Sequence, residues 1–522
     1  MKTTETTEPA ATPITGRYAW YVLFILVLVY ILNFVDRQIL SILAEDVKRD
    51  LNLTDADLGF LYGTAFGVFY ALFGIPLGRL ADSWKRVRLM TIGLSIWSAM
   101  TALSGFSRSG AELAGARFGV GIGEATASPC AYSLLSDYFP KEQRATALAI
   151  YSSGLYLGAG LSLFIGGLVV KNWNAAYAGG DAPLGLAGWQ AAFLAVGLPG
   201  LLLAVVVATL REPLRGQSDG IITPPVETPF RGFIEELTTV IPPFTLIGAA
   251  RRGVSALMIN VAVGAAVAIF AYLLISVTGD IPQWIAIGIG VYAVFSWATA
   301  LRYRDPPAFA LIWGTPAFLC VTLGYGLIAF TAYAVSFWSA PYAMRVLGAS
   351  PETAGFWIGA SGALGGFLGV IIGGQLADRL RKTNPAGRII VALTGAIAPL
   401  VPFIISFTTD SLTLFYALQL PMTALSSCAL GASAATVLDL VLPRMRGAAT
   451  ATFFIGTTLV GLALGPYMAG KVSSLTGDLA TGMLSLLAVA PISITALILA
   501  YRWVPLAETT VINRARAAGE VI

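Results

Sequence analysis

The stretch Ile31-Leu-Asn-Phe-Val-Asp36-Arg37-Gln-Ile-Leu40 places two full charges inside an apolar run that is long enough to be a membrane-spanning helix. An ionisable side chain at this depth costs about 2.5 kcal/mol or more. Such residues are therefore usually paired, face the interior of a helix bundle and mark a transport pathway. We take Asp36 and Arg37 as the predicted functional centre. The alternative is an ion pair that only fixes how the helices pack.

The composition of the chain is that of an integral membrane protein. Of its 522 residues 57% are hydrophobic and only 11% are charged, whereas soluble domains carry about 25% charged residues. The net charge of +4 is spread over short turns, which argues against a nucleic-acid partner. No Walker-type loop, nucleophile constellation or metal-ligand cluster is present, so neither an enzyme nor a cofactor is expected. Because the chain has no histidine, proton chemistry near neutral pH would rest on carboxylates.

Fourteen apolar runs are long enough to span a bilayer, which takes about 20 residues. Lys and Arg gather in every second turn between the runs, so both chain ends are predicted to be cytoplasmic. Residues 1–17 are polar and rich in Thr and Pro, which predicts a disordered cytoplasmic tail rather than a signal peptide. The predicted spans are 18–43, 58–80, 89–106, 112–138, 145–170, 189–210, 254–277, 284–300, 309–337, 353–376, 389–407, 412–442, 448–472 and 481–504.

The chain repeats itself, which indicates two homologous halves. Gly78-Arg-Leu-Ala-Asp82-Ser-Trp-Lys85-Arg86 recurs as Gly374-Gln-Leu-Ala-Asp378-Arg-Leu-Arg381-Lys382, with identical spacing between glycine, acid and basic pair. Two such halves, with a site near the membrane midplane between them, are typical of secondary transporters. The predicted organisation is an N-terminal six-helix half (18–210), a cytoplasmic linker with an amphipathic surface helix (211–250), an inserted two-helix hairpin (251–304), a C-terminal six-helix half (305–504) and a cytoplasmic tail (505–522).

Two further charges fall in the predicted span 112–138. Arg117 and Glu124 are seven residues apart, hence on nearly the same helix face and about 10 Å apart along the axis. Counting from the outer helix ends places Asp36 and Arg117 at a similar depth, so an ion pair between them is expected. Glu124 lies deeper, where desolvation favours the neutral carboxyl and makes it a candidate proton site. The open alternative is a Glu124 held ionised by Arg37 or Arg117.

At this point several motifs resemble those of a known family. Gly78-x-Leu-Ala-Asp82 with the following basic pair resembles the signature between helices 2 and 3 of the major facilitator superfamily. Arg117-Phe-Gly-Val-Gly-Ile-Gly-Glu124-Ala resembles its helix 4 signature. The combination of Asn33-Phe-Val-Asp36-Arg37, Gly-Glu124-Ala and Asp137-Tyr-Phe-Pro-Lys-Glu-Gln-Arg144-Ala is similar to the spinster branch.

The resemblance implies an all-α major facilitator fold whose two halves rock about a central site and export lysolipids or sphingosine-phosphate-like lipids, often with protons. We therefore predict a monomeric, proton-coupled transporter of an amphipathic anionic or zwitterionic lipid in the inner membrane of a bacterium, surrounded by membrane lipids. A drug or small organic-anion transporter is the alternative in the same superfamily, and a channel or non-transporting receptor is the alternative from another class. The assigned residues are Asn33, Arg37, Arg117, Glu124, Tyr325 and Trp338 for substrate, Asp36 and Glu124 for protons, and Gly78, Asp82, Arg86, Asp137, Arg144, Asp378 and Arg381 for gating.

Overall fold

The computed structural model describes residues 16–219 and 227–521, and in these ranges the chain is helical, without a β-strand. Thirteen of the described helices are long and apolar enough to cross a membrane. The expected span 112–138 is instead two shorter helices, α5 (Gly110–Glu124) and α6 (Ala127–Tyr138), which meet at Ala125 and Thr126. We interpret this pair as the fourth span of the expected fourteen, broken in the middle. The predicted tail 1–17 lies outside the described residues apart from its last two.

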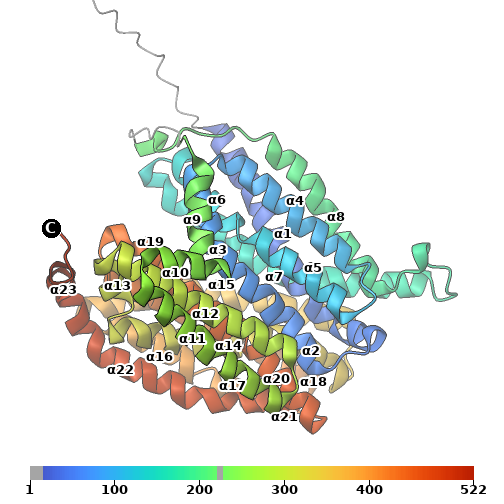
Figure 1. Cartoon of the computed structure of the whole chain (residues 1–522). Helices are drawn as coiled ribbons and strands as arrows, with labels where there is room; N and C mark the ends of the chain where they lie inside the picture. The colour runs from blue at the N-terminus through green and yellow to red at the C-terminus, as the bar shows by residue number, and fades with distance from the viewer. Residues whose placement is uncertain (1–15, 220–226, 522) are drawn as a thin grey trace, which may run out of the picture.

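Two six-span halves flank an inserted helix pair (Figure 1). Beyond α5 and α6, the N-terminal half contains α1 (Arg17–Leu51), α2 (Asp55–Gly59), the π-helical segment η1 (Phe60–Thr64), α3 (Ala65–Ser83), α4 (Arg86–Ser104), α7 (Lys141–Ala176) and α8 (Gly188–Ala208). The C-terminal half contains α13 (Pro306–Ile312), α14 (Pro316–Arg345), α15 (Pro351–Thr383), α16 (Gly387–Ile397), α17 (Leu400–Ser406), α18 (Leu412–Asp439), α19 (Arg446–Gly456), the π-helical segment η5 (Thr457–Leu462), α20 (Gly465–Thr476), α21 (Leu479–Ser485) and α22 (Ala490–Thr509). The short helix α23 (Val511–Ala517) follows in the segment predicted as a tail.

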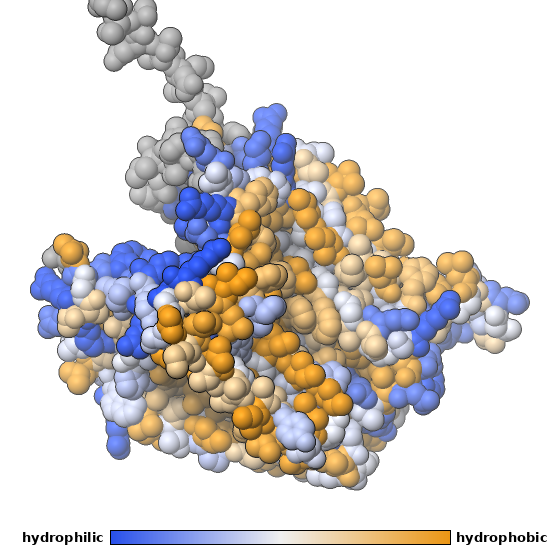
Figure 2. Space-filling model, in the orientation of Figure 1, coloured by the Kyte–Doolittle hydropathy of each residue, from blue (hydrophilic) through white to orange (hydrophobic). Residues whose placement is uncertain are grey.

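Between the halves, the linker forms two short helices at a bend of 97°, α9 (Pro229–Val240) and α10 (Phe244–Arg252). The inserted pair then follows as α11 (Val254–Thr278) and α12 (Ile281–Arg304). Figure 2 shows apolar residues gathered over this side of the molecule, with hydrophilic residues toward its ends. Such a surface fits an apolar bilayer between two polar interfaces.

The two halves are tied together at one end of the molecule. We call the end where α1 begins and α22 ends the terminal end, and the end where α1 and α14 finish the distal end. At the distal end the Arg345 guanidinium, on α14, lies 2.6 Å from the Asp55 carboxylate and 2.7 Å from that of Glu45. Asp55 also accepts hydrogen bonds from Lys48 and Ser473, so both halves meet at this one carboxylate. Figure 1 shows the halves converging there, at α2 and α20.

Glycines allow the second inter-half contact, between α7 and α15. A Cβ atom at Gly160 would lie 2.6 Å from the carbonyl oxygen of Gly359, and a Cβ at Gly359 would lie 2.5 Å from the carbonyl oxygen of Gly160. Only glycine permits backbones to approach this closely. Lys171 and Glu352 form an ion pair at the distal end of the same two helices. The distal half of this seam is therefore closed.

We predict that Arg345→Gln favours opening of the distal end. The substitution removes charge-assisted hydrogen bonds worth about 1.5–3 kcal/mol, enough to shift the ratio of distal-open to distal-closed molecules by roughly tenfold or more. Distances between spin labels on α2 and α20, measured by electron–electron double resonance, report this ratio. Arg49→Gln is the matched control, because within the described part of the chain Arg49 pairs only with Asp46 and Asp50 of its own helix. Unchanged α2–α20 distances in Arg345→Gln would show that the distal closure does not depend on this arginine.

Candidate functional site

Arg37 lies in the middle of α1 and is held by a carboxylate and by three aromatic rings, those of Phe34, Phe66 and Tyr70. Its Nη2 atom donates to Glu124 Oε2 at 2.7 Å, and its Nε donates to the same oxygen at 3.3 Å. The guanidinium carbon lies 4.6 Å from the ring centre of Phe34 and 4.5 Å from that of Phe66. Both charged side chains are almost fully buried. Of the two alternatives left open for Glu124, the structure therefore has the ion pair with Arg37, stabilised by cation–π contacts.

The expected ion pair between Asp36 and Arg117 does not form in the structure. Arg117 instead donates from Nη1 to the backbone carbonyl of Asp36 at 3.1 Å and from Nη2 to that of Arg37 at 3.4 Å. Asp36 and Arg117 lie at a similar depth, but depth does not specify the rotation of α1, which turns its main chain toward Arg117. Asp36 is fully buried, and neither of its carboxylate oxygens has a hydrogen-bond partner among the described residues.

A cavity of about 280 Å³ lies between the halves at mid-height. The N-terminal half contributes Arg37, Gln38, Tyr62 and Tyr156 to its wall, among others. Most of the wall comes from the C-terminal half, including the predicted residue Tyr325. The described wall thus combines one cation with aromatic, aliphatic and hydroxyl groups.

The remaining predicted substrate residues lie outside this wall. Trp338 is fully buried and donates from Nε1 to the carbonyl of Pro466 at 2.9 Å, so it packs between α14 and α20 rather than facing the cavity. Asn33 is buried one turn before Arg37, and its amide nitrogen has no partner among the described residues. Arg117 and Glu124 act on the cavity only through α1 and Arg37.

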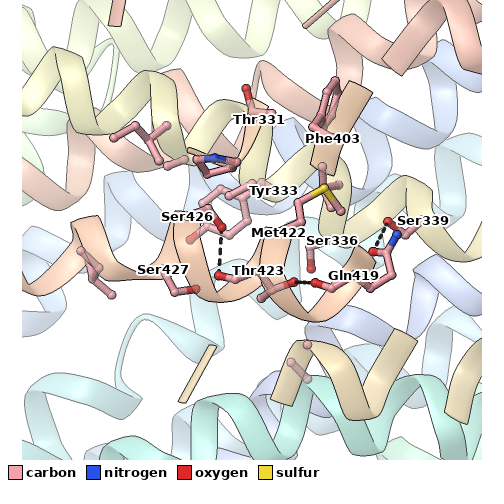
Figure 3. Close-up of a pocket in the computed structure, with 18 of the residues that line it drawn as sticks. Thr331, Tyr333, Ser336, Ser339, Phe403, Gln419, Met422, Thr423, Ser426 and Ser427 are labelled. Atoms are coloured by element: carbon pink, nitrogen blue, oxygen red, sulfur yellow. Dashed lines mark hydrogen bonds between the residues drawn. The ribbon is translucent and has the colours of Figure 1, made fainter. Parts of the chain in front are cut away.

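Figure 3 shows the polar part of the C-terminal wall, on α14 and α18. Gln419 accepts a hydrogen bond from Ser339 at 3.2 Å, while its amide nitrogen is buried and without a partner in the described chain. Thr423 and Ser426 bond back to carbonyls of their own helix, at 2.8 and 3.1 Å. Gln419 therefore offers a buried amide donor on this wall that no described residue uses.

A hydrogen-bonded clamp joins the halves directly beside Arg37. Gln38 donates from Nε2 to the carbonyl of Ser336 at 2.6 Å and to its hydroxyl at 2.9 Å, and Tyr62 donates to Gln38 Oε1 at 2.7 Å. Ser41 donates to the carbonyl of Phe337 at 2.5 Å. Gln38 and Tyr62 were not predicted as site residues, although Gln38 directly follows Asp36 and Arg37 in the sequence. Because Gln38 lines the cavity and bridges the halves, it links the site to the distal closure.

Comparison with known proteins agrees with this architecture. The family model described as Major Facilitator Superfamily matches residues 26–344, more than half of the chain. The chain belongs to the major facilitator superfamily. It is a transporter of this superfamily and an integral, multi-pass membrane protein.

Its relatives within the superfamily include spinster proteins, and the chain is spinster-like. It is 26% identical over 480 residues to protein spinster homolog 1 of Xenopus tropicalis, covering 88% of this chain and 74% of that one. It is 28% identical over 468 residues to an MFS-type efflux pump of Mycolicibacterium smegmatis, covering 89% and 86%. A crystal structure of a bacterial homolog to the human lysosomal transporter spinster, in an inward-facing and unoccupied conformation, superposes with a TM-score of 0.67 at 25% identity, covering 96% and 98%.

At the terminal end, the predicted gating residues of this superfamily member mostly brace each half internally. Arg86 is buried, pairs with Asp137 and lies 2.8 Å from Glu212. Arg144 donates to Ser218 at 2.9 Å, and Arg381 pairs with Glu508. None of these named contacts joins the N-terminal half to the C-terminal half.

The C-terminal half contains a counterpart of this brace that the repeat did not predict. Arg388 pairs with Asp439 and lies 3.3 Å from Asp378, as Arg86 pairs with Asp137 at the end of the fourth span. The repeat pointed to Arg381, but the arginine that opens the next span lies ten residues after Asp378, whereas Arg86 lies four residues after Asp82. Because the turn after Asp378 is longer than the turn after Asp82, the sequence repeat does not align Arg388 with Arg86.

Asp82 is the predicted gate residue with no brace of its own. It is exposed and forms no hydrogen bond or ion pair with any described residue. A Cβ added at Gly78, or at its counterpart Gly374, would meet no atom within 4 Å. Both repeat motifs therefore have free space on this side, as expected if they approach a partner only in another conformation.

We predict that Arg86→Gln destabilises the protein more than Arg388→Gln. The first leaves two carboxylates without their buried partner, a loss of about 3 kcal/mol or more, while Arg388 and its partners are more exposed. Tryptophan fluorescence during heating of the purified protein in detergent measures the unfolding midpoint. If Arg86→Gln unfolds at the wild-type temperature, Arg86 does not stabilise the N-terminal half, and gating is the role that remains for it.

Proposed function

We propose that the protein is a proton-coupled transporter of an amphipathic anionic or zwitterionic lipid, such as a lysophospholipid or a sphingosine-phosphate-like lipid. The observation that carries the proposal is Arg37, the one cation on the described wall of a mainly apolar cavity at mid-height. A guanidinium offers a planar fork of donors matched to a phosphate. The wall opposite Arg37 has apolar groups that suit the alkyl chain of a lipid and hydroxyl groups that suit its glycerol or sphingoid backbone. The resemblance of the sequence to the spinster branch implies the same substrate class.

We further propose that the terminal end is cytoplasmic and that transport proceeds by rocking of the two halves. The basic turns at this end support the orientation. The ion pairs of Arg345 and the clamp at Gln38 hold the distal end closed, so this conformation would offer its site to the cytoplasm. Opening the distal end requires both sets of contacts to break while Gly78, Asp82 and Gly374 close on the other half.

Proton coupling would operate through competition for Arg37. A substrate phosphate and the Glu124 carboxylate seek the same guanidinium. When substrate displaces Glu124, the carboxylate loses its counter-charge in a buried site, where the neutral form costs far less. Substrate binding and protonation of Glu124 therefore favour each other, which by linkage favours movement of lipid and proton in the same direction.

Asp36 has a different part in this proposal. An ionised carboxylate without a hydrogen bond is expensive at this depth, so Asp36 would be neutral in this conformation while Glu124 is ionised. This assignment reverses the order expected from the sequence, where Asp36 was the acid predicted to pair with arginine. Both acids remain candidates for the coupled proton, in different conformations.

The first prediction from the proposed function concerns the headgroup. Arg37→Lys keeps the charge but loses the planar fork, so the affinity for a lysophospholipid should fall by about tenfold or more. Binding is measured by quenching of tryptophan fluorescence on titration with lysophosphatidylglycerol. Arg302→Lys, at the end of α12 and away from the cavity, is the control. Normal binding by both Arg37→Lys and Arg37→Ala would assign Arg37 to packing alone.

The second prediction concerns the proton. Glu124→Gln mimics the protonated acid, so it should bind lipid at least as tightly as the wild type and lose the pH dependence of binding. The control is Glu112→Gln on the same helix, where Glu112 lies exposed in the first turn. Titrations across pH 5.5–8.5 provide the comparison. A Glu124→Gln protein whose lipid affinity still follows pH would exclude Glu124 from coupling.

A drug or small organic-anion transporter is the second candidate. The relative named as an efflux pump and the aromatic part of the cavity wall favour it. Mass spectrometry of lipids that copurify with the protein, compared with those of Arg37→Ala, separates the two candidates. Counterflow in proteoliposomes separates either carrier from a channel or a receptor, because only a carrier exchanges labelled for unlabelled substrate.

A further inference from the structure

The inserted pair α11–α12 lies over one of the two seams between the halves. Helix α12 packs against α3 and η1 of the N-terminal half and against η5 of the C-terminal half. A Cβ at its Gly290 would lie 3.0 Å from Leu459 of η5 and 3.6 Å from Val68 of α3. One point on α12 therefore touches both walls of the seam. In Figure 1 the inserted pair crosses the front of the molecule over this region.

The distal turn of the hairpin is fastened to α20. Asp280 accepts a hydrogen bond from Tyr467 at 2.6 Å and lies 2.8 Å from Lys471. Lys471 also donates to the carbonyl of Thr278 at 2.6 Å. The Trp284 ring stands edge-on to Tyr467, with 5.6 Å between ring centres. These bonds fix the hairpin to the C-terminal wall of the seam.

The other end of the hairpin is fastened to the N-terminal wall through α9. Arg304, at the end of α12, lies 2.6 Å from the buried carboxylate of Glu236 on α9. Helix α9 is in turn joined to the end of α3, because Ser83 donates to the carbonyl of Pro229 at 2.8 Å and Trp84 packs on Phe230. The hairpin and α9 together thus form a strap from α20 to α3.

The space under this strap is small and apolar. A hole of about 10 Å³ is lined by residues of α3, α9, α12 and the α19–η5 segment, among them Ala71, Val240, Val294 and Ile455. A site needs about 10–15 Å³ and polar partners to hold even one water molecule. An acyl chain cannot pass through such a space. The seam is therefore closed to the bilayer along the part that the strap covers.

The other seam, between α7 and α15, has no such cover among the described elements. Its outer surface exposes large apolar side chains directly, including Leu157, Phe356 and Phe367. The same two helices line the cavity through Tyr156 and Gly362, and a Cβ at Gly362 would meet no atom within 4 Å. At this seam the cavity lies one helix layer from the bilayer.

We propose that the inserted hairpin is a seal that closes the α3–η5 seam, so that an amphipathic substrate exchanges with the bilayer only along the terminal half of the α7–α15 seam. The substrate route rests on the proposed lipid function, whereas the seal itself does not. The anchors at Asp280 and Arg304 hold the seal on opposite walls. The hairpin thus makes lipid access one-sided in a fold with two equivalent seams.

The test maps contact between lipid and protein in the wild-type chain. The protein is reconstituted in phosphatidylcholine vesicles in which a fraction of the lipid carries a diazirine at mid-chain, and adducts are located by mass spectrometry after irradiation. We expect adducts on Leu157 and Phe367 and on the outer face of α11, with at least tenfold lower yield at Ala71 and Ile455. Comparable yields at Ala71 or Ile455 would overturn the seal.

A variant pair tests the cause. Gly290→Trp inserts a ring between α12 and the seam, and should raise the adduct yield at Ala71 and Ile455 several-fold. Ile289→Trp is the matched control, since the Ile289 side chain is exposed on the outer surface of α12. Gly290→Trp with an unchanged map contradicts a sealing role for α12, and if this variant does not fold, the wild-type map still decides. A sealed seam in a protein that transports no lipid would refute the proposed substrate and leave the seal in place.

Discussion

The ion pair between Arg37 and Glu124 is the interaction on which the rest of the site depends. Two opposite charges buried at mid-membrane stabilise each other only while they remain together, and separating them is costly. Phe34, Phe66 and Arg117 are arranged around this pair: the rings hold the guanidinium, and Arg117 fixes the two α1 carbonyl groups on either side of the Arg37 Cα atom. Any ligand that takes Arg37 must therefore supply a negative charge and leave Glu124 a way to become neutral.

The clamp at Gln38 joins this chemistry to the shape of the molecule. Arg37 and Gln38 are adjacent on α1, one facing Glu124 and the other bonded to Ser336 of the opposite half. Movement of the Arg37 guanidinium would therefore also move the segment of α1 that holds the two halves together through Gln38. Farther out, Asp55 gathers Arg345, Lys48 and Ser473 at the distal end. The distal closure is distributed over separate contacts, which suits a transition between two discrete states.

Much of the fold was predictable, because apolar runs identify the membrane spans and a repeated motif identifies the two halves. The break in the fourth span was not predictable, since α5 ends at Glu124 within a run that is apolar on both sides. Burial of Asp36, Arg37 and Glu124 followed from their position, but their pairing depended on the rotation of α1 and α5, which spacing within one helix does not determine. Nothing in the sequence around Trp338 indicates whether its side chain faces the cavity or packs between helices. Arg388 was missed because its turn is longer than that of Arg86, although their partners are equivalent.

The central claim is that substrate and proton meet at the Arg37–Glu124 pair. The most direct measurement is proton exchange on lipid binding, followed with a pH-indicator dye in weakly buffered detergent solution near neutral pH. The account predicts that lysophospholipid binding removes on the order of one proton from solution per protein, because Glu124 becomes neutral when the lipid phosphate takes its arginine. Saturating lipid binding with no change in dye signal would contradict it.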